Sequence, residues 1–265
     1  MADRRRSILY SDWGKAWYPD RELERMHSST VVIGAGRVGQ TVATRLGAKL
    51  IGHGDDPDLT GCRRLLIATP DSAIQPVCET LAPRLEGGAA VIHFSGATSI
   101  HALDAVAGPT ACVHPLQTVW PELGPDQLEG AYAAVTGDHE VGQQLAHELG
   151  MTPFALADEA KPVYHAASAI ASNYLVTLTQ VAIGLMERAG LDHDLAQRAL
   201  RPLQERTLEV ADHPPTGPIA RGDAATVAAH MEAIGAELAP LYLALARATL
   251  PIVPPASARA VEHLL

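Results

Sequence analysis

The stretch that decides the fold is residues 29–40, which reads STVVIGAGRVGQ. A short apolar strand runs directly into Gly34, Gly36 and Gly39, and a predicted helix follows. In such a G-x-G-x-x-G loop the first glycine permits a tight turn, the second a close approach of a pyrophosphate, and the third close helix–strand packing. The helix N-terminus offers unpaired N–H groups to phosphate oxygens. The stretch therefore predicts a dinucleotide-binding loop that also contains Arg37 and Val38.

Strands and helices continue to alternate on the C-terminal side of this loop. We expect strands at 50–54, 63–70, 89–96, 110–115, 132–137 and 152–157, with helices at 37–49, 74–85 and 139–150. Alternation at this spacing indicates a parallel, doubly wound sheet, and the apolar strands indicate that both of its faces are covered.

The texture of the chain changes close to residue 157. After it the segments 158–189, 192–212 and 223–250 are rich in Ala and Leu at helical spacing, separated by GLDHD and by HPPTGPIARGD. We therefore divide the chain into three parts: a polar N-terminal extension over 1–28 that packs on the body or on a partner, an α/β domain over 29–157, and an all-helical domain over 158–265.

Composition excludes several classes of protein. A formal net charge of -10 argues against nucleic acid or an anionic membrane as the main partner. No apolar run reaches the roughly 20 residues that a membrane span needs, and the start of the chain lacks a signal peptide. Cys62, Cys78 and Cys112 are odd in number and unpaired in spacing, so we expect no disulfide framework, no metal site and a cytoplasmic location.

The residues that would select the cofactor leave NADP and NAD both open. The acidic residue expected about 20 positions after the loop is Asp55 or Asp56, which would favour NAD. Arg37 in the loop, or Arg63 and Arg64 beyond it, would accommodate a 2′-phosphate. The link to the next strand is also too short for the usual helix.

Polar residues follow three consecutive predicted strands at the edge where a ligand lies in a doubly wound sheet. Thr69 and Pro70 follow one strand, His93 and Ser95 the next, and His114 the third. We expect this group to form the rim of a site, although each member alone is more often a cap or a turn.

Lys161 is a candidate functional residue because lysine is rare in this chain and occurs only at residues 15, 49 and 161. His165, Ser168 and Ser172 follow it at helical spacing, so all four share one face, and Asn173 lies about 120° round. Lys161 could donate a proton to a carbonyl oxygen that receives hydride. The alternative is a surface lysine and a helix histidine satisfied by a neighbour.

A second polar element is the loop TGPIARGD, residues 216–223. Arg221 is a natural clamp for a carboxylate, and Asp223 can cap the following helix. The alternative is a plain connection between helices.

These motifs in combination, GAGRVG, ATPDSAI, HFSGA, HPLQT, K-x-x-Y-H-A-A-x-x-x-A-S-N-Y and TGPIARGD, resemble the bacterial proteins that pair a Rossmann-like domain with a DUF2520 domain. Such proteins are related to ketopantoate reductase, pyrroline-5-carboxylate reductase and the 6-phosphogluconate dehydrogenase superfamily. The resemblance runs from about residue 29 to the C-terminus. It implies a helical domain like the C-terminal domain of 6-phosphogluconate dehydrogenase, through which the chain would form a homodimer.

In these relatives a lysine and an asparagine four residues later contact the substrate. Lys161 matches the lysine, whereas His165 stands at the asparagine position and Asn173 lies further along. The resemblance implies reduction of a small keto or imino acid with NADP or NAD, with ketopantoate as the first guess. One alternative is a dinucleotide-binding sensor or scaffold without turnover. A methyl- or nucleotidyl-transferase is a more distant alternative, because its glycine loop would not be expected to match a pyrophosphate fingerprint so fully.

Overall fold

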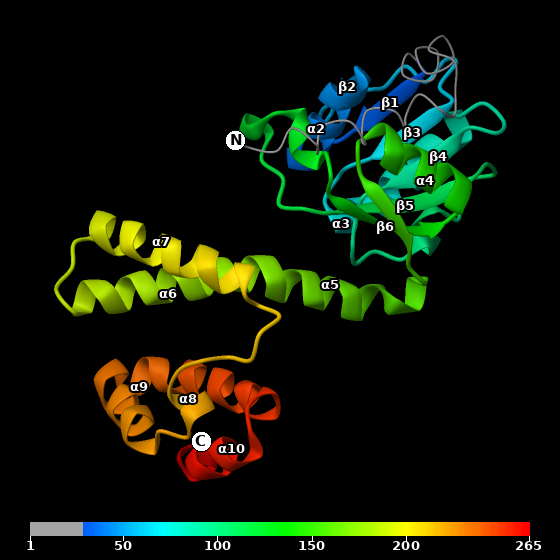
Figure 1. The fold of residues 1–265 in the computed structure, drawn as a ribbon. Helices are drawn as coiled ribbons and strands as arrows, with labels where there is room; N and C mark the ends of the chain where they lie inside the picture. The colour runs from blue at the N-terminus through cyan, green and yellow to red at the C-terminus, as the bar shows by residue number, and fades with distance from the viewer. Residues whose placement is uncertain (1–28) are drawn as a thin grey trace, which may run out of the picture. The chain divides into compact units, whose positions relative to one another are not determined.

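The computed structural model describes residues 29–265, so the expected role of residues 1–28 lies outside the described part. The chain forms two compact units, one ending at Asn173 and the other spanning Tyr174–Leu265 (Figure 1). The last strand ends at Ala155, and the first unit continues through the start of the helical region. Lys161 therefore belongs to the same compact unit as the sheet.

The first unit contains a seven-stranded sheet in the order β2-β1-β3-β4-β5-β6-β7. The predicted doubly wound α/β fold is confirmed, and the strands are β1 (Thr30–Ile33), β2 (Lys49–Ile51), β3 (Arg64–Ile67), β4 (Ala90–His93), β5 (Thr110–Leu116), β6 (Tyr132–Gly137) and β7 (Thr152–Ala155).

One pairing in this sheet differs from the predicted parallel arrangement. β6 runs antiparallel to β5, while all other neighbours are parallel. The connection between β5 and β6 contains only the short 3₁₀ turns η4 (Pro121–Leu123) and η5 (Pro125–Leu128). Without a crossover helix the chain returns beside β5 in the opposite direction.

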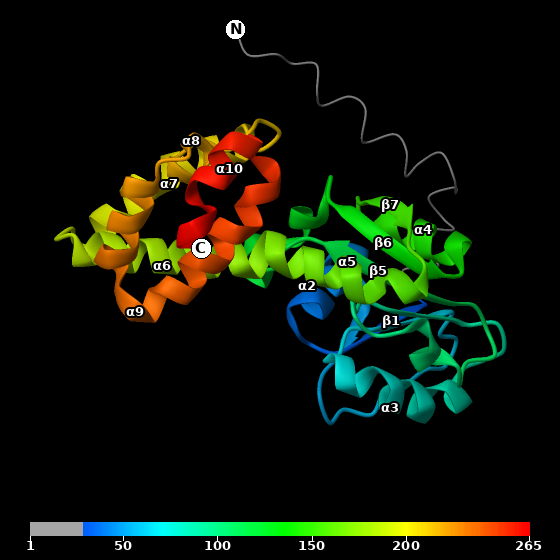
Figure 2. The ribbon, with the colours of Figure 1, turned by 90° about the horizontal axis from the view of Figure 1, so that it is seen from below.

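Helices cover both faces of the sheet, as the uniformly apolar strands require. α2 (Arg37–Leu46) and α4 (His139–Glu148) share one apolar core with the sheet, and α3 (Asp71–Leu81) packs in the other with η3 (Ile100–Leu103). Figure 2 shows α3 and α4 on opposite sides of the strands. The link from β2 to β3 contains no helix, as its length predicted.

This order places a switch point at β1, because β2 lies on one side of it and β3 on the other. The Gly34–Gly39 loop leaves the carboxyl end of β1, and Thr69 follows the adjacent end of β3. Ligands of doubly wound sheets bind in the crevice at such a point. The fold therefore directs attention to this edge.

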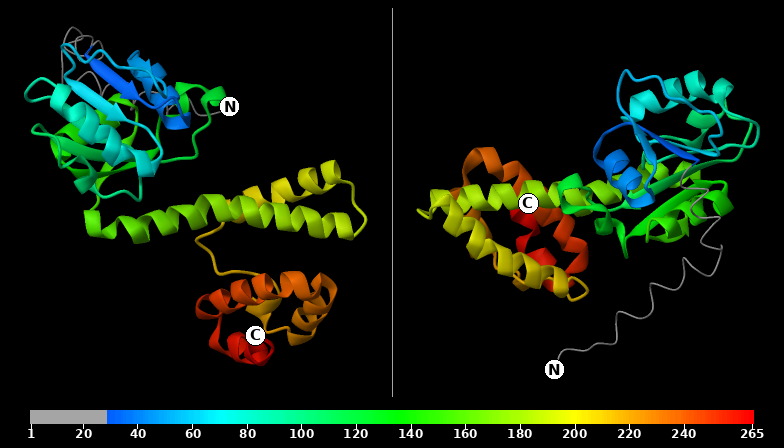
Figure 3. Two further views of the ribbon diagram at one scale, coloured as in Figure 1. Left: turned by 180° about the vertical axis from the view of Figure 1, so that it is seen from behind. Right: turned by 90° about the horizontal axis from the view of Figure 1, so that it is seen from above.

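Residues 158–188 form one helical run, shown green to yellow-green in Figure 3. It consists of η6 (Asp158–Ala160), α5 (Lys161–Ala169), a π-helical turn (Ile170–Tyr174) and α6 (Leu175–Arg188). The remaining elements are α7 (His193–Glu209), α8 (Pro218–Arg221), α9 (Ala224–Thr249), η8 (Leu250–Ile252), α10 (Pro255–Val261) and η9 (Glu262–Leu264). Gly235 interrupts α9 with a φ of 77°, so α9 is two helices joined by a kink.

The expectation that no segment is long and apolar enough to span a membrane is wrong by length and composition. Two helices of the described part, Asp158–Arg188 and Ala224–Ile252, contain windows of mean hydropathy 1.4 and 1.2. Core helices of soluble proteins pass the same test, so two such helices are weak evidence for a span. Only 6% of each window is buried within the chain, which leaves much apolar surface uncovered.

Candidate active site

The three glycines of the loop have different surroundings. Gly34 has a φ of +108°, and a Cβ there would lie 2.6 Å from the carbonyl oxygen of Ala68. A Cβ on Gly39 would lie 1.8 Å from the carbonyl oxygen of Gly34. At Gly36 the nearest atom would be 3.9 Å away. Gly34 and Gly39 thus serve the turn and the packing of α2, and Gly36 borders open space.

This open space is a cavity of about 960 Å³ along the carboxyl ends of β1, β2 and β3. Of the predicted cofactor-binding residues it is lined by Gly34, Gly36, Arg37, Val38, Thr69, Pro70 and Ser95. Gly39 does not line it but supports the loop from behind. The hydroxyl of Thr69 is buried without a hydrogen-bond partner. A buried hydroxyl at a cavity wall suits a polar ligand, because such groups are normally paired.

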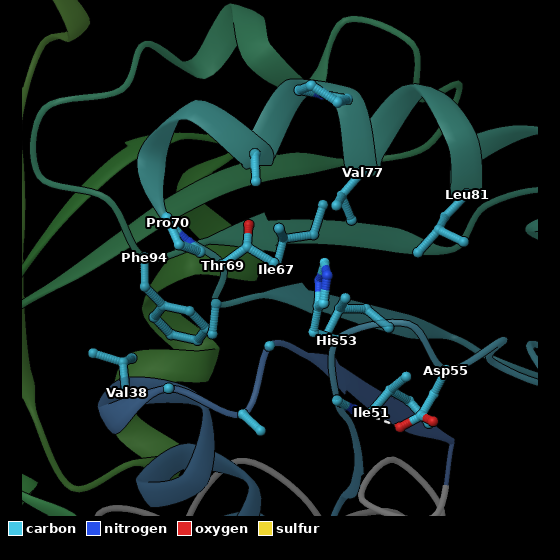
Figure 4. A pocket seen from close by; sticks show the side chains of 18 of the residues that line it. Val38, Ile51, His53, Asp55, Ile67, Thr69, Pro70, Val77, Leu81 and Phe94 are labelled. Atoms are coloured by element: carbon cyan, nitrogen blue, oxygen red, sulfur yellow. Dashed lines mark hydrogen bonds between the residues drawn. The ribbon is translucent and has the colours of Figure 1, made fainter.

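The two ends of the cavity differ in character (Figure 4). Val77 and Leu81 of α3 face Ile51, His53 and Asp55 at one end, while Val38, Pro70 and Phe94 gather at the other (Figure 4). The first end offers apolar walls for a planar base and a carboxylate beside them. The lining of the cavity therefore differs between these two groups of side chains.

The arginines suggested beyond the loop do not belong to this cavity. Arg64 pairs with Thr30 at the amino ends of β3 and β1, at the opposite edge of the sheet, and Arg63 precedes it. Arg64 is buried and makes two hydrogen bonds to the carboxylate of Glu148, of 3.0 and 2.7 Å. The suggestion that Arg63 or Arg64 accommodates a 2′-phosphate is therefore wrong.

Lys161 is not a surface residue, because only 1% of it is exposed. Its Nζ lies 3.0 Å from Sγ of Cys112 on β5. The Cys112 thiol in turn donates to the backbone carbonyl of Ser95 at 3.1 Å. Burial raises the pKa of this thiol although the nearby Lys161 opposes the shift. Ser95 lines the cavity, so two hydrogen bonds connect the cavity wall to the lysine.

Asp158 fixes the start of the helical run that carries Lys161. One carboxylate oxygen accepts from the Ser99 hydroxyl at 2.5 Å, and the other accepts from the backbone N–H of Ile100 at 2.9 Å. Both partners lie in the segment after β4. The lysine is thus anchored against the same segment that contains Ser95.

Two histidines beside the lysine are neutral at pH 7. Burial, with Lys161 nearby, lowers the pKa of His93 to about 3. Burial, with His165 and Lys161 nearby, lowers the pKa of His114 to about 4. The backbone N–H of Ser95 donates to Nδ1 of His93, so the His93 proton sits on Nε2, which is buried without a partner.

His114 and His165 come together over Gly96, where a Cβ would lie 2.8 Å from an atom of each ring. Nδ1 of His114 also lies 2.8 Å from the hydroxyl oxygen of Tyr164. The rings of His114 and His165 make an edge contact with centroids 6.0 Å apart. The structure thus groups Lys161, His114 and His165, three of the predicted site residues, around the ends of β4 and β5.

The other predicted residues lie elsewhere. The hydroxyls of Ser168 and Ser172 donate to the backbone carbonyls of Tyr164 and Ser168, one helical turn back. Asn173 is exposed and accepts from Ser172, within the π-helical turn that alters the helical spacing. Asp223 caps α9 as predicted, accepting from the backbone N–H of Thr226 at 3.1 Å. Arg221 ends α8 in the second unit.

Sequence reasoning gave no role to Cys112 or Tyr164. A signal existed for Cys112, which lies two residues before His114 on a strand, so their side chains share a face. Tyr164 stands next to His165 in the quoted helix motif, and only the packing of α5 shows that it contacts His114.

Comparison with known proteins agrees with this architecture. Residues 131–249 match a family model described as a domain of unknown function, DUF2520, which confirms the resemblance over that range. No curated protein matches the chain.

Solved structures with the same fold are numerous. A Bacteroides fragilis protein described as an NADP oxidoreductase is 17% identical with a TM-score of 0.71, covering 84% of this chain and 98% of its own. A Thermotoga maritima protein is 20% identical with a TM-score of 0.61, covering 87% and 98%. Pyrroline carboxylate reductase from Plasmodium falciparum, with NADP bound, is 13% identical with a TM-score of 0.55, covering 88% and 97%. These likenesses establish the fold.

Proposed function

We propose that this chain is an NAD(P)-dependent oxidoreductase that reduces a small keto or imino acid, with ketopantoate as the first substrate to try. The observation that carries the proposal is the hydrogen-bonded connection from the cavity wall to Lys161, through Ser95 and Cys112. It brings a dinucleotide-type cavity and a buried amine into one compact unit. The likeness to structures of NADP-binding reductases agrees with it.

The residues present fit a nicotinamide dinucleotide. The open side of Gly36 and the N-terminus of α2 would hold the pyrophosphate, and the unpartnered Thr69 hydroxyl offers a polar contact. The bound nicotinamide would supply the hydride. The protein's own contribution is to exclude water and to provide a proton.

Lys161 is the proposed proton donor to the carbonyl or imine group. It has three N–H donors, and the described hydrogen bonds engage it with Cys112 alone. Because burial lowers the pKa of His93 to about 3 and that of His114 to about 4, neither of these imidazoles is a cationic proton donor at pH 7. His165, Ser168, Ser172 and Asn173 remain proposed substrate contacts, with Arg221 as the clamp for a substrate carboxylate and Asp223 beside it.

The test replaces Lys161 by Met, which keeps the volume and the apolar part of the buried side chain. We expect kcat to fall by about 10²–10⁴, the range of general acid catalysis, with dinucleotide affinity nearly unchanged. Lys161→Arg should fail nearly as badly, because a guanidinium keeps its proton near neutral pH. A panel of keto and imino acids is screened first with NADH and NADPH, and melting curves check that each variant is folded.

The same measurements separate an enzyme from a sensor. A sensor predicts that the wild-type chain binds a dinucleotide, turns over none of the panel and is indifferent to both changes at Lys161. Full activity of folded Lys161→Met would contradict the proposed role of the lysine.

We also propose that the chain forms a homodimer through its second unit. Large apolar side chains of that unit, including Val176, Leu203, Leu208 and Ile252, are more than 60% exposed. Soluble monomers rarely expose large apolar patches, and several large apolar side chains exposed in one unit therefore favour an interface between copies. A second copy of the chain offers the same apolar faces and so matches them.

A further inference from the structure

Helix α5 meets the end of β5 through two successive contacts. The first joins Lys161 to Cys112. Three residues further along the helix, the hydroxyl oxygen of Tyr164 lies 2.8 Å from Nδ1 of His114, and His114 is two residues beyond Cys112 on the strand. Side chains two residues apart on a strand point to the same face, so the two contacts are neighbours on one face of the sheet. The proton transfer proposed for Lys161 does not use the second contact.

The ring of Tyr164 is held on two sides. It makes an edge contact with the ring of Phe154 on β7, with ring centroids 6.0 Å apart. A second edge contact, with centroids 5.4 Å apart, joins it to the ring of His114. Burial raises the pKa of the Tyr164 hydroxyl, so this group keeps its proton at pH 7. Tyr164 therefore presents an O–H donor at a fixed place beside Nδ1 of His114.

The contact with Tyr164 bears on which nitrogen of His114 carries the proton. A neutral imidazole has one N–H, and the hydrogen bond made by one ring nitrogen sets the position of that proton. His114 is neutral at pH 7 because burial lowers its pKa to about 4. A phenol is a stronger acid than the N–H of a neutral imidazole, which favours the phenol as the donor and Nδ1 as the acceptor. In that arrangement the proton of His114 lies on Nε2.

Nε2 of His114 faces the segment that borders the cavity. A Cβ on Gly96 would lie 2.8 Å from this nitrogen, and Gly96 directly follows Ser95 of the cavity wall. Among residues 29–265 the structure gives Nε2 of His114 no hydrogen-bond partner, and this nitrogen is not enclosed as Nε2 of His93 is. A ligand beside Gly96 can therefore reach it.

We propose that Tyr164 is a positioning residue, whose hydroxyl fixes His114 in the tautomer with its proton on Nε2, and that this N–H donates a hydrogen bond to a carbonyl or carboxylate oxygen of the substrate. The N–H of a neutral imidazole can polarise a carbonyl without giving up its proton. His114 then holds the oxygen, and Lys161 supplies the proton. The inference rests on the proposed function, because it assigns His114 to the same substrate.

The tautomer is tested by NMR on the full chain with 15N-labelled histidine at pH 7.5. A ring nitrogen that carries a proton and one that does not have well separated 15N shifts. The spectrum of His114→Gln assigns the His114 signals by their loss. We expect the wild-type proton on Nε2. In Tyr164→Phe the Nδ1 signal should move, because this nitrogen loses its donor, and the tautomer with the proton on Nδ1 should become detectable.

Tyr242→Phe is the matched control. The hydroxyl oxygen of Tyr242 lies 2.9 Å from Nδ1 of His230, and their rings also make an edge contact, but this pair belongs to the second unit. The control should move the His230 signals. It should leave the His114 signals and turnover unchanged.

Turnover tests whether Tyr164 acts through His114. With a substrate from the panel, Tyr164→Phe should lower kcat by about tenfold to a hundredfold, as the loss of a partner that orients a histidine commonly does, with dinucleotide affinity nearly unchanged. Glutamine at 114 can place an amide N–H near the position of Nε2 without help from Tyr164. In the His114→Gln background Tyr164→Phe should therefore cost less than about twofold, because residues that act as a pair are not additive.

Three results would overturn the inference: a wild-type His114 proton on Nδ1, unchanged His114 signals in Tyr164→Phe, or equal losses of kcat in the two backgrounds. The proposed function fails separately. If the tautomer is as expected but the chain turns over no member of the panel, the positioning role of Tyr164 stands and the proposed reaction does not.

Discussion

At the scale of single residues, Gly36 is a position where a substitution should affect dinucleotide binding and hardly affect the stability of the fold. Its φ of -75° is available to any residue, and a Cβ there meets nothing closer than 3.9 Å. We therefore expect Gly36→Val to abolish dinucleotide binding, because the side chain fills the space that the pyrophosphate needs. The free energy of unfolding should change by only about 1 kcal/mol. Titration with NADH and a urea unfolding curve measure the two effects.

Gly39→Ala is the matched change on the same loop. A methyl group there would meet the Gly34 carbonyl at 1.8 Å, so α2 must move away from β1. This variant should lose stability as well as binding. If Gly36→Val kept full affinity in a folded chain, the loop would not be the pyrophosphate site.

His114 gives a prediction about pH. The pKa of His114 is about 4 in the folded chain because of burial, against about 6.5 in the unfolded chain. Between these values the unfolded chain binds more protons, so stability falls as the pH falls from about 6.5 towards 4. His114→Gln should reduce this slope by roughly 1 kcal/mol per pH unit. Urea unfolding at pH 5, 6 and 7 measures it, and equal slopes in both chains would contradict the role of His114.

The sequence alone predicted the functional residues of the glycine loop better than it predicted the residues around Lys161. Each glycine of the loop is needed for a local feature, and the G-x-G-x-x-G spacing already indicates that feature. The contact between Lys161 and Cys112 joins residues 49 positions apart, and it exists because α5 packs against the end of β5. No local pattern encodes that packing, so Cys112 and Tyr164 were missed.

At the scale of elements, a buried ion pair fastens β3 to α4. Arg64 and Glu148 are 8% and 7% exposed, and Arg64 also donates to the Thr30 hydroxyl. Glu148→Gln leaves the Arg64 charge buried without its partner, which should destabilise the fold by about 3–5 kcal/mol. Chemical unfolding measures the loss. Because the pair lies at the amino edge of the sheet, dinucleotide affinity of the folded variant should not change.

The structure differs from two predictions about the elements, and the reason is the same in both cases. The sequence marks β5 and β6 as strands but does not say in which direction β6 runs, since the connection decides this and contains only short turns. The helix from residue 158 likewise gives no local sign of its π-helical turn, which changes how Ser172 and Asn173 are presented. Connections and defects of this kind depend on tertiary packing.

At the scale of the whole molecule, the uncovered apolar helices predict assembly. We expect a dimer at micromolar concentration, measured by sedimentation. Leu203→Glu and Leu208→Glu, each placed on an exposed apolar residue of α7, should weaken it. Arg198→Glu introduces the same side chain at another exposed position of this helix and serves as the control. A monomeric wild-type chain would contradict the proposed dimer.

The order of an α/β part followed by an all-helical part could be predicted from periodicity, because period and length differ clearly between strands and helices. The residue at which the first compact unit ends could not be predicted in this way. Contacts of Asp158 with Ser99 and Ile100, and of Lys161 with Cys112, join the first helical turns to the sheet. They are long-range contacts, and the periodicity of a helix does not reveal its neighbours.

The extension of the first unit to Asn173 has a consequence for how the chain can be cut. A fragment that stops at residue 157 would lack Lys161, which covers Cys112 on β5, so Cys112 should react with alkylating reagents. A fragment that continues to residue 173 would keep Lys161, and Cys112 should resist alkylation as in the intact chain. Protease nicking between residues 210 and 217, where α7 has ended, should likewise leave Cys112 shielded.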